Sequence, residues 1–156
     1  MGVAVGLIEP RIPQNTGNIA RLCAAAGATL HLIEPLGFDL DDERLKRAGL
    51  DYWPAVDIWV HPFWNAFRES ISRERCLYFS THGNQAYTEA PYASNSVLIF
   101  GNETAGMPQR IREKHPERIF RIPMQPTVRS LNLATSVGIV LYECLRQLGV
   151  DWNSTL

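Results

Sequence analysis

The stretch from Ser96 to Glu143 constrains the fold of this chain more than any other part. It holds a short apolar run, Val97–Phe100, and a second predicted strand, Ile119–Ile122, and each ends in a loop that combines Gly or Pro with polar side chains. Short continuous apolar runs are typical of strands that are covered on both faces of a parallel sheet. Ligands bind such sheets at the carboxyl ends of the strands. The pattern therefore predicts an α/β fold with a binding site in these loops.

The rest of the chain alternates between the same two kinds of segment. Strands are predicted at Val3–Ile8, Thr29–Glu34, Val56–Val60, Cys76–Ser80, Val97–Phe100 and Ile119–Ile122. Helices are predicted at Asn15–Ala26, Asp41–Gly49, Pro62–Ile71, Pro108–His115 and Leu131–Leu148. The segment from Thr81 to Asn95 is expected to be a loop. Because strands alternate with helices, residues 1–156 are predicted to form one domain with a mostly parallel sheet flanked by helices.

The composition excludes several classes of protein. No apolar run approaches the roughly 20 residues of a membrane helix, and the first residues lack the basic region of a signal peptide. The cysteines are odd in number and far apart, which predicts buried thiols in a cytoplasmic protein (Cys23, Cys76, Cys144). The chain lacks Gly-x-Gly, which excludes the dinucleotide fingerprint, and it also lacks the P-loop pattern. No residue pattern indicates a metal, and His31 and His61 are expected to be structural.

The net charge of −1 argues against non-specific nucleic-acid binding, but the basic residues are clustered. One cluster is Arg44, Lys46 and Arg47, and the other consists of Arg110, Arg112, Lys114, His115, Arg118 and Arg121. Such clusters are solvated faces or contacts for RNA, and the sequence leaves both interpretations open.

Three polar segments are candidates for a site. Asn15 is predicted to cap the first helix, and Arg21 lies about 9 Å further along the axis, within reach of a phosphate. Gly101 is expected to allow close approach of a ligand or a positive φ, and Glu103 to accept hydrogen bonds from amides. Two prolines stiffen the segment that begins at Ile122, before Ser130 or Asn132 caps the last helix. A stiff loop of this kind suits a preformed pocket wall.

Taken together, these segments resemble the three motifs of the SPOUT class of RNA methyltransferases. The motifs are carried by Asn15–Arg21, Leu98–Pro108 and Ile122–Leu133. Three further runs are similar to the TrmL group of that class, the tRNA (cytidine/uridine-34)-2′-O-methyltransferases: Pro10–Asn18, Ile33–Phe38 and Arg47–Tyr52. The resemblance extends from about Val3 to Gly149. It implies a deep trefoil knot near the C-terminal end, S-adenosyl-L-methionine as cofactor with S-adenosyl-L-homocysteine as product, tRNA as substrate, and a homodimer.

The resemblance also implies roles for particular residues. The catalytic positions are Arg21, Glu103, Ser130 and Asn132. The cofactor positions are Phe79, Thr81, Gly101, Asn102, Glu103, Ile122, Met124, Ser130 and Leu131. Asn102 stands where many relatives have Pro, which is expected to loosen the turn, and Ala105 stands where a basic residue is common.

A ribose 2′-hydroxyl is a poor nucleophile until it loses its proton, and Arg21 is the best candidate to assist there. Because Arg remains protonated, positioning and charge stabilisation are favoured over action as a base. Gly138 and Tyr142 on the last helix are expected at a dimer interface. Two alternatives stay open: methylation of another RNA site, and a non-catalytic RNA-binding module of the same fold.

Overall fold

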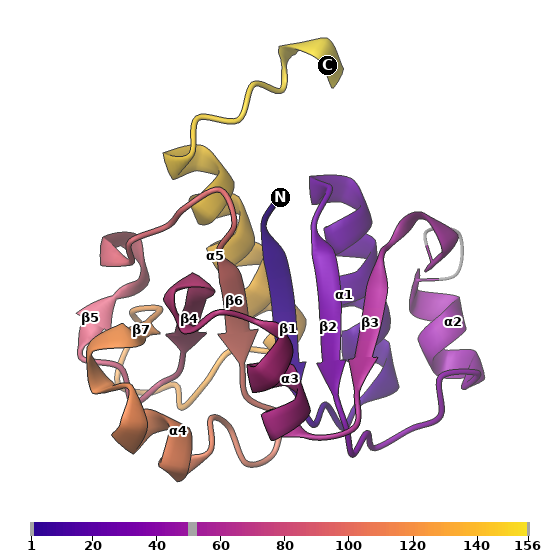
Figure 1. Ribbon diagram of the computed structural model, residues 1–156, viewed down its shortest axis with the longest axis horizontal. Coiled ribbons are helices and arrows are strands. Elements are labelled where there is room, and N and C mark those ends of the chain that lie inside the picture. The colour runs from indigo at the N-terminus through magenta and orange to yellow at the C-terminus, as the bar shows by residue number, and fades with distance from the viewer. Residues whose placement is uncertain (1, 50–52, 156) are drawn as a thin grey trace.

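The computed structural model describes residues 2–49 and 53–155. Leu50, Asp51 and Tyr52 of the run Arg47–Tyr52, and Leu156 at the end of the chain, lie outside the described residues. Seven strands form one sheet in the order β3-β2-β1-β6-β4-β7-β5, and every pair of neighbours is parallel (Figure 1). The strands are β1 (Ala4–Ile8), β2 (Thr29–Ile33), β3 (Ile58–His61), β4 (Cys76–Phe79), β5 (Gln85–Ala86), β6 (Val97–Phe100) and β7 (Ile119–Arg121).

Five α-helices surround this sheet. They are α1 (Pro13–Ala26), α2 (Glu43–Gly49), α3 (Trp64–Ser70), α4 (Gln109–Lys114) and α5 (Leu133–Gln147). Short 3-10 turns lie at Trp53–Ala55, Arg73–Arg75, Tyr87–Glu89, Pro116–Arg118 and Asn153–Thr155. Helices α1 and α5 cover one face of the sheet, while α3 and α4 lie on the other, nearer the viewer in Figure 1. The prediction of an α/β fold with a parallel sheet is confirmed.

Alternate side chains of the central strands fill two separate cores. On one face, residues such as Val5 and Leu98 pack against Ile19 of α1 and Val140 of α5. On the other face, residues such as Ile99 pack beneath α3 and α4. Strands buried on both faces explain the continuous apolar runs of the sequence. Cys23, Cys76 and Cys144 are buried thiols, as predicted.

Several predicted boundaries were wrong for local reasons. Asn15 does not cap α1, because Pro13 occupies the first turn and Ile12 holds the cap position. Helix α2 begins at Glu43 rather than Asp41, since the Asp42 carboxylate accepts the backbone N–H of Arg44.

The expected loop from Thr81 to Asn95 contains the short strand β5 and a 3-10 turn. Both residues of β5 are exposed at the edge of the sheet, so they give no apolar signal in the sequence. Within the part of the chain that is described, no helix is long and apolar enough to cross a membrane, and no group of three or more metal-binding side chains is found.

Candidate active site

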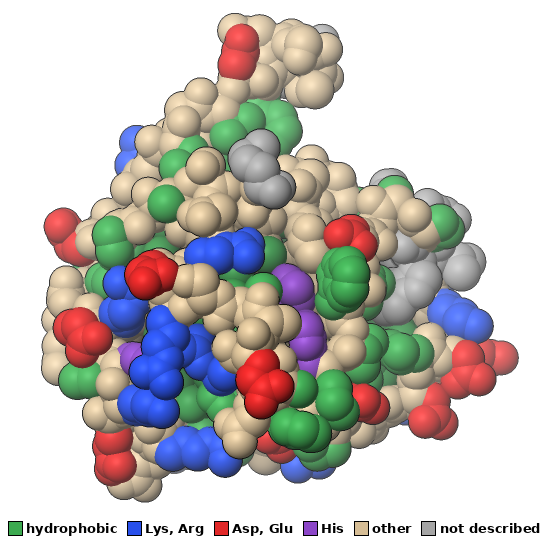
Figure 2. Space-filling model, viewed as in Figure 1, with side chains coloured by type: hydrophobic (Ala, Val, Ile, Leu, Met, Phe, Trp, Pro, Cys, Tyr) green, Lys and Arg blue, Asp and Glu red, His purple; other side chains and the backbone are tan. Residues whose placement is uncertain are grey.

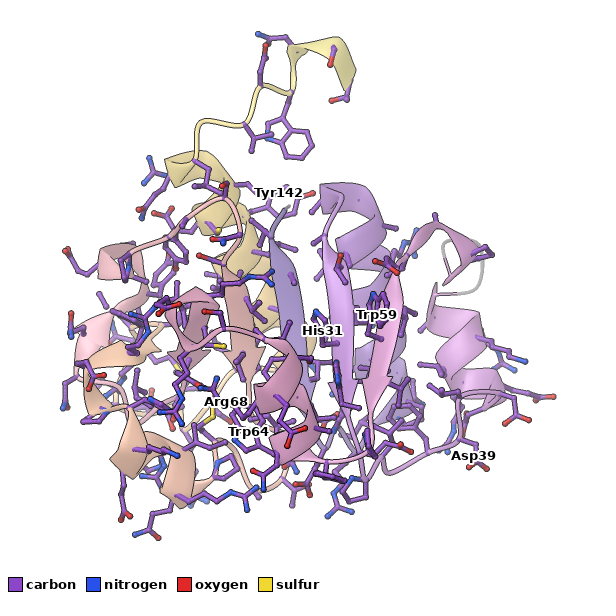
Figure 3. The ribbon with its side chains drawn as sticks, viewed as in Figure 1. His31, Asp39, Trp59, Trp64, Arg68 and Tyr142 are labelled. Atoms are coloured by element: carbon purple, nitrogen blue, oxygen red, sulfur yellow. The ribbon has the colours of Figure 1, made fainter. Side chains whose placement is uncertain are left out.

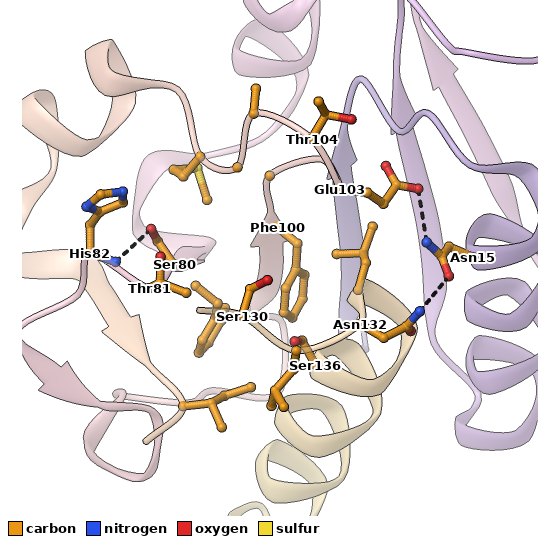
Figure 4. A pocket seen from close by; sticks show the side chains of 18 of the residues that line it. Asn15, Ser80, Thr81, His82, Phe100, Glu103, Thr104, Ser130, Asn132 and Ser136 are labelled. Carbon is orange, nitrogen blue, oxygen red and sulfur yellow. Dashed lines mark hydrogen bonds between the residues drawn. The ribbon is translucent and has the colours of Figure 1, made fainter. Parts of the chain in front are cut away.

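A pocket of about 450 Å³ lies at the carboxyl ends of β4, β6 and β7 (Figure 4). Segments distant in the sequence form its wall: the loop after β4, the turn after β6, the segment after β7 and the first turn of α5. Of the positions that the resemblance implies, the lining contains Phe79, Thr81, Gly101, Glu103, Ile122, Met124, Ser130, Leu131 and Asn132. The structure therefore brings most of the predicted site residues to one place.

The turn after β6 is held by its own residues. A Cβ atom on Gly101 would lie 2.1 Å from the carbonyl carbon of Gly106, so the turn closes on itself only with glycine at position 101. Gly106 has a φ of +68°, a conformation that also favours glycine. Backbone packing within the turn therefore requires glycine at position 101, whose φ is not positive. Gly101 also lines the pocket, and the close approach of a ligand there stays a prediction.

Asn102 closes this turn through its side chain. Its side-chain oxygen accepts the backbone N–H groups of Thr104 and Ala105, and its amide donates to the carbonyl of Glu9. An Asn side chain closes a turn through hydrogen bonds of this kind. Asn102 is not among the residues that line the pocket, so its contribution is to the shape of the turn.

Glu103 joins the turn to the beginning of α1. Its two carboxylate oxygens accept the backbone N–H groups of Arg11 and Ile12 at 2.9 and 2.8 Å. The same carboxylate accepts the side-chain amide of Asn15 at 3.2 Å. A carboxylate at the start of a helix satisfies free N–H groups and interacts favourably with the helix dipole. The expectation that Glu103 accepts amide hydrogen bonds is confirmed.

Asn15 continues this chain of hydrogen bonds to α5. Its side-chain oxygen accepts the amide of Asn132 at 3.1 Å (Figure 4). The side-chain oxygen of Asn132 in turn accepts the backbone N–H of Thr135. Asn132 is therefore the cap of α5. Sequence reasoning assigned Asn15 only a local capping role and missed this link, because the three segments meet only in the folded sheet.

The apolar part of the pocket comes from aromatic and aliphatic side chains. The rings of Phe79 and Phe100 stack with their centroids 5.3 Å apart. Ser80 and His82 also line the pocket although neither was predicted, and the Ser80 hydroxyl accepts the backbone N–H of His82. Their position directly after a buried strand is the signal that identifies them in the sequence.

Three predicted residues lie away from the pocket. Arg21 is exposed on α1 and is not part of the lining. Tyr142 of α5 is 42% exposed and stacks on Trp152 of the C-terminal segment (Figure 3). A Cβ on Gly138 would meet Leu22 of α1 at an ordinary 3.5 Å, so Gly138 lies where α1 and α5 approach each other.

His31 and His61 lie outside the pocket, in the core beneath α3. Their ring nitrogens share a hydrogen bond of 2.9 Å, and both rings pack against Phe67. Burial, with smaller effects from His61 and Arg75, lowers the pKa of His31 to about 4. His31 is therefore a neutral core residue at pH 7, in agreement with the structural role predicted for it.

The fold and the pocket define a class of protein. Residues 2–142 match the model of the SpoU rRNA Methylase family, and the chain belongs to this family. A tRNA (cytidine(34)-2′-O)-methyltransferase of Burkholderia cenocepacia is 46% identical over 150 residues, which cover 94% of this chain and 96% of that protein.

Solved structures agree with the family assignment. One, described as structural insights into the 2-OH methylation of C/U34 on tRNA, matches with a TM-score of 0.88 and 46% identity, covering 95% of this chain and 91% of that one. An AdoMet-bound rRNA methyltransferase from Sinorhizobium meliloti matches with a TM-score of 0.82 and 30% identity, covering 94% of this chain and 57% of that one.

Proposed function

We propose that this chain transfers a methyl group from S-adenosyl-L-methionine to the ribose 2′-hydroxyl of nucleotide 34, a cytidine or uridine, in tRNA. The observation that carries the proposal is the convergence of the three motif segments on one pocket at the carboxyl edge of the sheet. The relatives named for this reaction match nearly the full length of the chain. We propose that residues 1–156 act as one catalytic domain in the cytoplasm, on tRNA and without a metal.

The pocket fits the proposed cofactor in size and chemistry. Its volume of about 450 Å³ is within the range of roughly 300–1,000 Å³ that is usual for small-molecule sites. Phe79, Ile122 and Leu131 offer apolar surface for a purine ring, and Thr81 and Ser130 offer hydroxyl groups for polar atoms. We propose that these residues, with Gly101, Glu103 and Met124, hold the cofactor and that Asn102 acts by shaping the turn.

The bound cofactor supplies a methyl group on a sulfonium centre, which is open to direct displacement by an oxygen nucleophile. The chain must then hold the ribose hydroxyl in line with the methyl carbon and accept one proton in its surroundings. Ser130 is the side chain of the lining that we assign to the ribose. The side chain of Asn132 already bonds Asn15 and Thr135, so Asn132 acts as a positioning residue for the pocket wall.

Arg21 is assigned to the ribose-phosphate, which it stabilises as a permanent cation while the proton passes to phosphate or water. Within one chain, Arg21 lies about 9 Å along the helix axis from Asn15, which is at the rim of the pocket. We therefore propose that Arg21 serves the pocket of a second copy. A homodimer built on α5 through the exposed Tyr142 provides that copy, while Gly138 faces Leu22 of α1 in the same chain.

The segment after β7 supports the knotted arrangement that the family resemblance implies. Ile122, Met124, Ser130 and Leu131 line the same pocket as the Ser80–His82 loop, although the two segments are far apart in sequence. We propose that this C-terminal segment passes through the preceding loop as a trefoil knot. An experimental density map traced from β4 to α5 tests this threading directly.

One experiment decides between the proposed function and its alternatives. Purified protein is incubated with total tRNA and methyl-labelled cofactor, and the 2′-O-methyl groups are mapped by nucleotide. Label at position 34 is the expected result. Label at another position would establish a different RNA site, and cofactor binding without transfer to any RNA would favour the non-catalytic module.

A further inference from the structure

Basic side chains gather on the sheet face that carries α3 and α4. We call Arg68, Arg73, Arg75, Lys114 and Arg118 the basic face. Figure 2 shows Lys and Arg side chains collected on this side of the molecule, toward the left of the view. The face lies opposite α1 and α5, because α3 and α4 cover the other core. A dimer built on α5 would therefore leave it open to solvent.

Three of these cations act on one imidazole. His115 stacks on Tyr78, with the ring centroids 5.2 Å apart and the planes within 8° of each other. Burial lowers the pKa of His115, and the charges of Arg68, Arg73 and Lys114 lower it further. The charge of Glu117 raises the pKa and so opposes them. The cations contributed by α3, the turn after it and α4 thus lie near enough to His115 to act on the same ring.

Neutral acceptors hold several guanidinium groups of the face in place. Arg118 donates to the carbonyls of Cys76 and Glu74 at 2.8 and 2.9 Å. Arg75 donates through Nε to the carbonyl of Asn95 at 2.7 Å. Each guanidinium has five N–H donors, so donors remain for a ligand after these bonds are made. A carbonyl fixes the position of a cation and leaves its charge uncompensated.

Arg68 is fixed in a similar way. It donates to the Sγ atom of Cys76 at 3.4 Å, and its guanidinium carbon lies 5.8 Å from the centre of the Trp64 ring. None of the five cations has a carboxylate oxygen within 4.0 Å among residues 2–49 and 53–155, where the ion pairs are Arg44–Asp42 and Arg146–Glu143. The same segments carry Glu69, Glu74, Glu113 and Glu117, but none of these carboxylates pairs directly with a cation of the basic face.

We propose that the basic face binds the phosphate backbone of the RNA substrate, outside the pocket where the methyl group is transferred. This inference rests on the proposed function. Arginine forks match phosphate oxygens in geometry and charge. Trp59 and Phe63, which precede α3, are each 56% exposed, but no large apolar side chain is exposed within residues 64–76 or 108–121, which carry the basic face. A protein interface or a membrane-bound surface needs an apolar centre. RNA is the partner that fits a polar, positively charged surface.

Helix α4 leads from the pocket to the basic face. Met107 lines the pocket, and α4 begins two residues later, at Gln109. Lys114 at the end of α4 is about 8 Å further along the helix axis. Arg75 and Arg118 directly precede β4 and β7, so they lie at the amino ends of these strands. An RNA that places one ribose in the pocket therefore reaches the basic face by running along α4.

The test is a paired substitution with a matched control. Arg73→Gln with Lys114→Gln removes two exposed charges of the face that make no hydrogen bond or ion pair in the described part of the chain. Lys46→Gln with Arg47→Gln removes two exposed charges from α2 as the control. Binding of total tRNA is measured by filter retention over a series of salt concentrations, and methyl transfer gives KM and kcat. Circular dichroism and cofactor affinity verify that both double variants are folded.

The Arg73/Lys114 variant should bind tRNA roughly tenfold or more weakly, and its salt slope should fall by about 2, one for each lost phosphate contact. Its KM for tRNA should rise while kcat at saturating tRNA and the cofactor affinity stay the same. The control should match the wild type. Normal tRNA binding by the Arg73/Lys114 variant, or equal loss in the control, would overturn the inference. If the wild type itself methylates no tRNA, the proposed function fails instead.

Discussion

Replacing Glu103 with Gln tests whether the turn after β6 and the start of α1 depend on one carboxylate. In the folded chain this carboxylate accepts the N–H groups of Arg11 and Ile12 and the amide of Asn15. The substitution keeps the size of the side chain but exchanges one acceptor oxygen for an NH₂ donor. In either orientation of the new amide, its NH₂ group faces the N–H group of Arg11 or of Ile12, and two donors cannot form a hydrogen bond. The change therefore removes at least one bond and the charge that strengthens the others.

The magnitude follows from the number and kind of bonds. A hydrogen bond to a charged group contributes about 1.5–3 kcal/mol to stability. Water has access to this half-buried site and replaces part of the loss. We expect the free energy of unfolding to fall by about 2 kcal/mol, which lowers the Tm by roughly 4–8 °C for a chain of this length.

Thermal and urea unfolding of Glu103→Gln, with cofactor affinity from calorimetry, measures both consequences. Cofactor binding should weaken as well, because the turn that Glu103 holds forms a wall of the pocket. Glu89→Gln is the matched control, since Glu89 is exposed and makes no hydrogen bond through its side chain in the described chain. The reasoning is refuted if Glu103→Gln changes stability by no more than the control, about 0.5 kcal/mol.

Three further predictions concern the dimer, the glycines and pH. Arg21→Ala should abolish methyl transfer but leave cofactor binding intact. An equal mixture of the Arg21→Ala and Ser130→Ala variants should recover about a quarter of the activity, because about half of the dimers are mixed and each mixed dimer has one complete site of two. No recovery would place Arg21 in the pocket of its own chain. Gly101→Ala should abolish cofactor binding, as measured by calorimetry, because the added Cβ would lie 2.1 Å from a backbone atom. Gly138→Ala places its Cβ at 3.5 Å from a leucine methyl group. This variant should raise the free energy of unfolding by no more than about 1 kcal/mol, measured by thermal unfolding in the calorimeter. Because the pKa of His31 is about 4 in the folded chain, below its ordinary value, unfolded chains bind more protons at mildly acidic pH. The free energy of unfolding, measured with urea, should therefore fall by about 2–3 kcal/mol between pH 6.5 and pH 4. A free energy of unfolding that does not change with pH over this range would contradict the prediction.

The strands and the main helices were predictable because each follows a local rule. The apolar run Val97–Phe100 is a central strand, and Gly27 ends α1 with a φ of +71°, as a glycine after a helix is expected to do. Asn132 was one of two candidates for the cap of α5, and it is the cap. Rules that depend on a few neighbouring residues therefore served well here.

The errors arose where a distant partner decides the structure. Nothing near Asn15 in the sequence indicates that its side chain forms hydrogen bonds with Glu103 and Asn132 instead of capping the helix. Strand β5 exists because β7 pairs with it, and its two exposed residues carry no pattern of their own. Asn102 was interpreted only by comparison with the proline of its relatives, and the sequence did not indicate that its side-chain amide donates to the distant carbonyl of Glu9. Such contacts depend on topology, which the order of residues alone does not specify.

The hydrogen bonds from Glu103 through Asn15 to Asn132 have a consequence for when this protein becomes competent during synthesis. Their partners are separated by 88 and 117 positions, and the last of them lies in the final fifth of the chain. Contacts between such distant residues form only after a large loss of chain entropy. A nascent chain that ends before α5 contains the residues of the sheet and of α1 but lacks one wall of the pocket. Binding of a small molecule at this edge therefore reports that the chain has been made and folded at least as far as the first turn of α5.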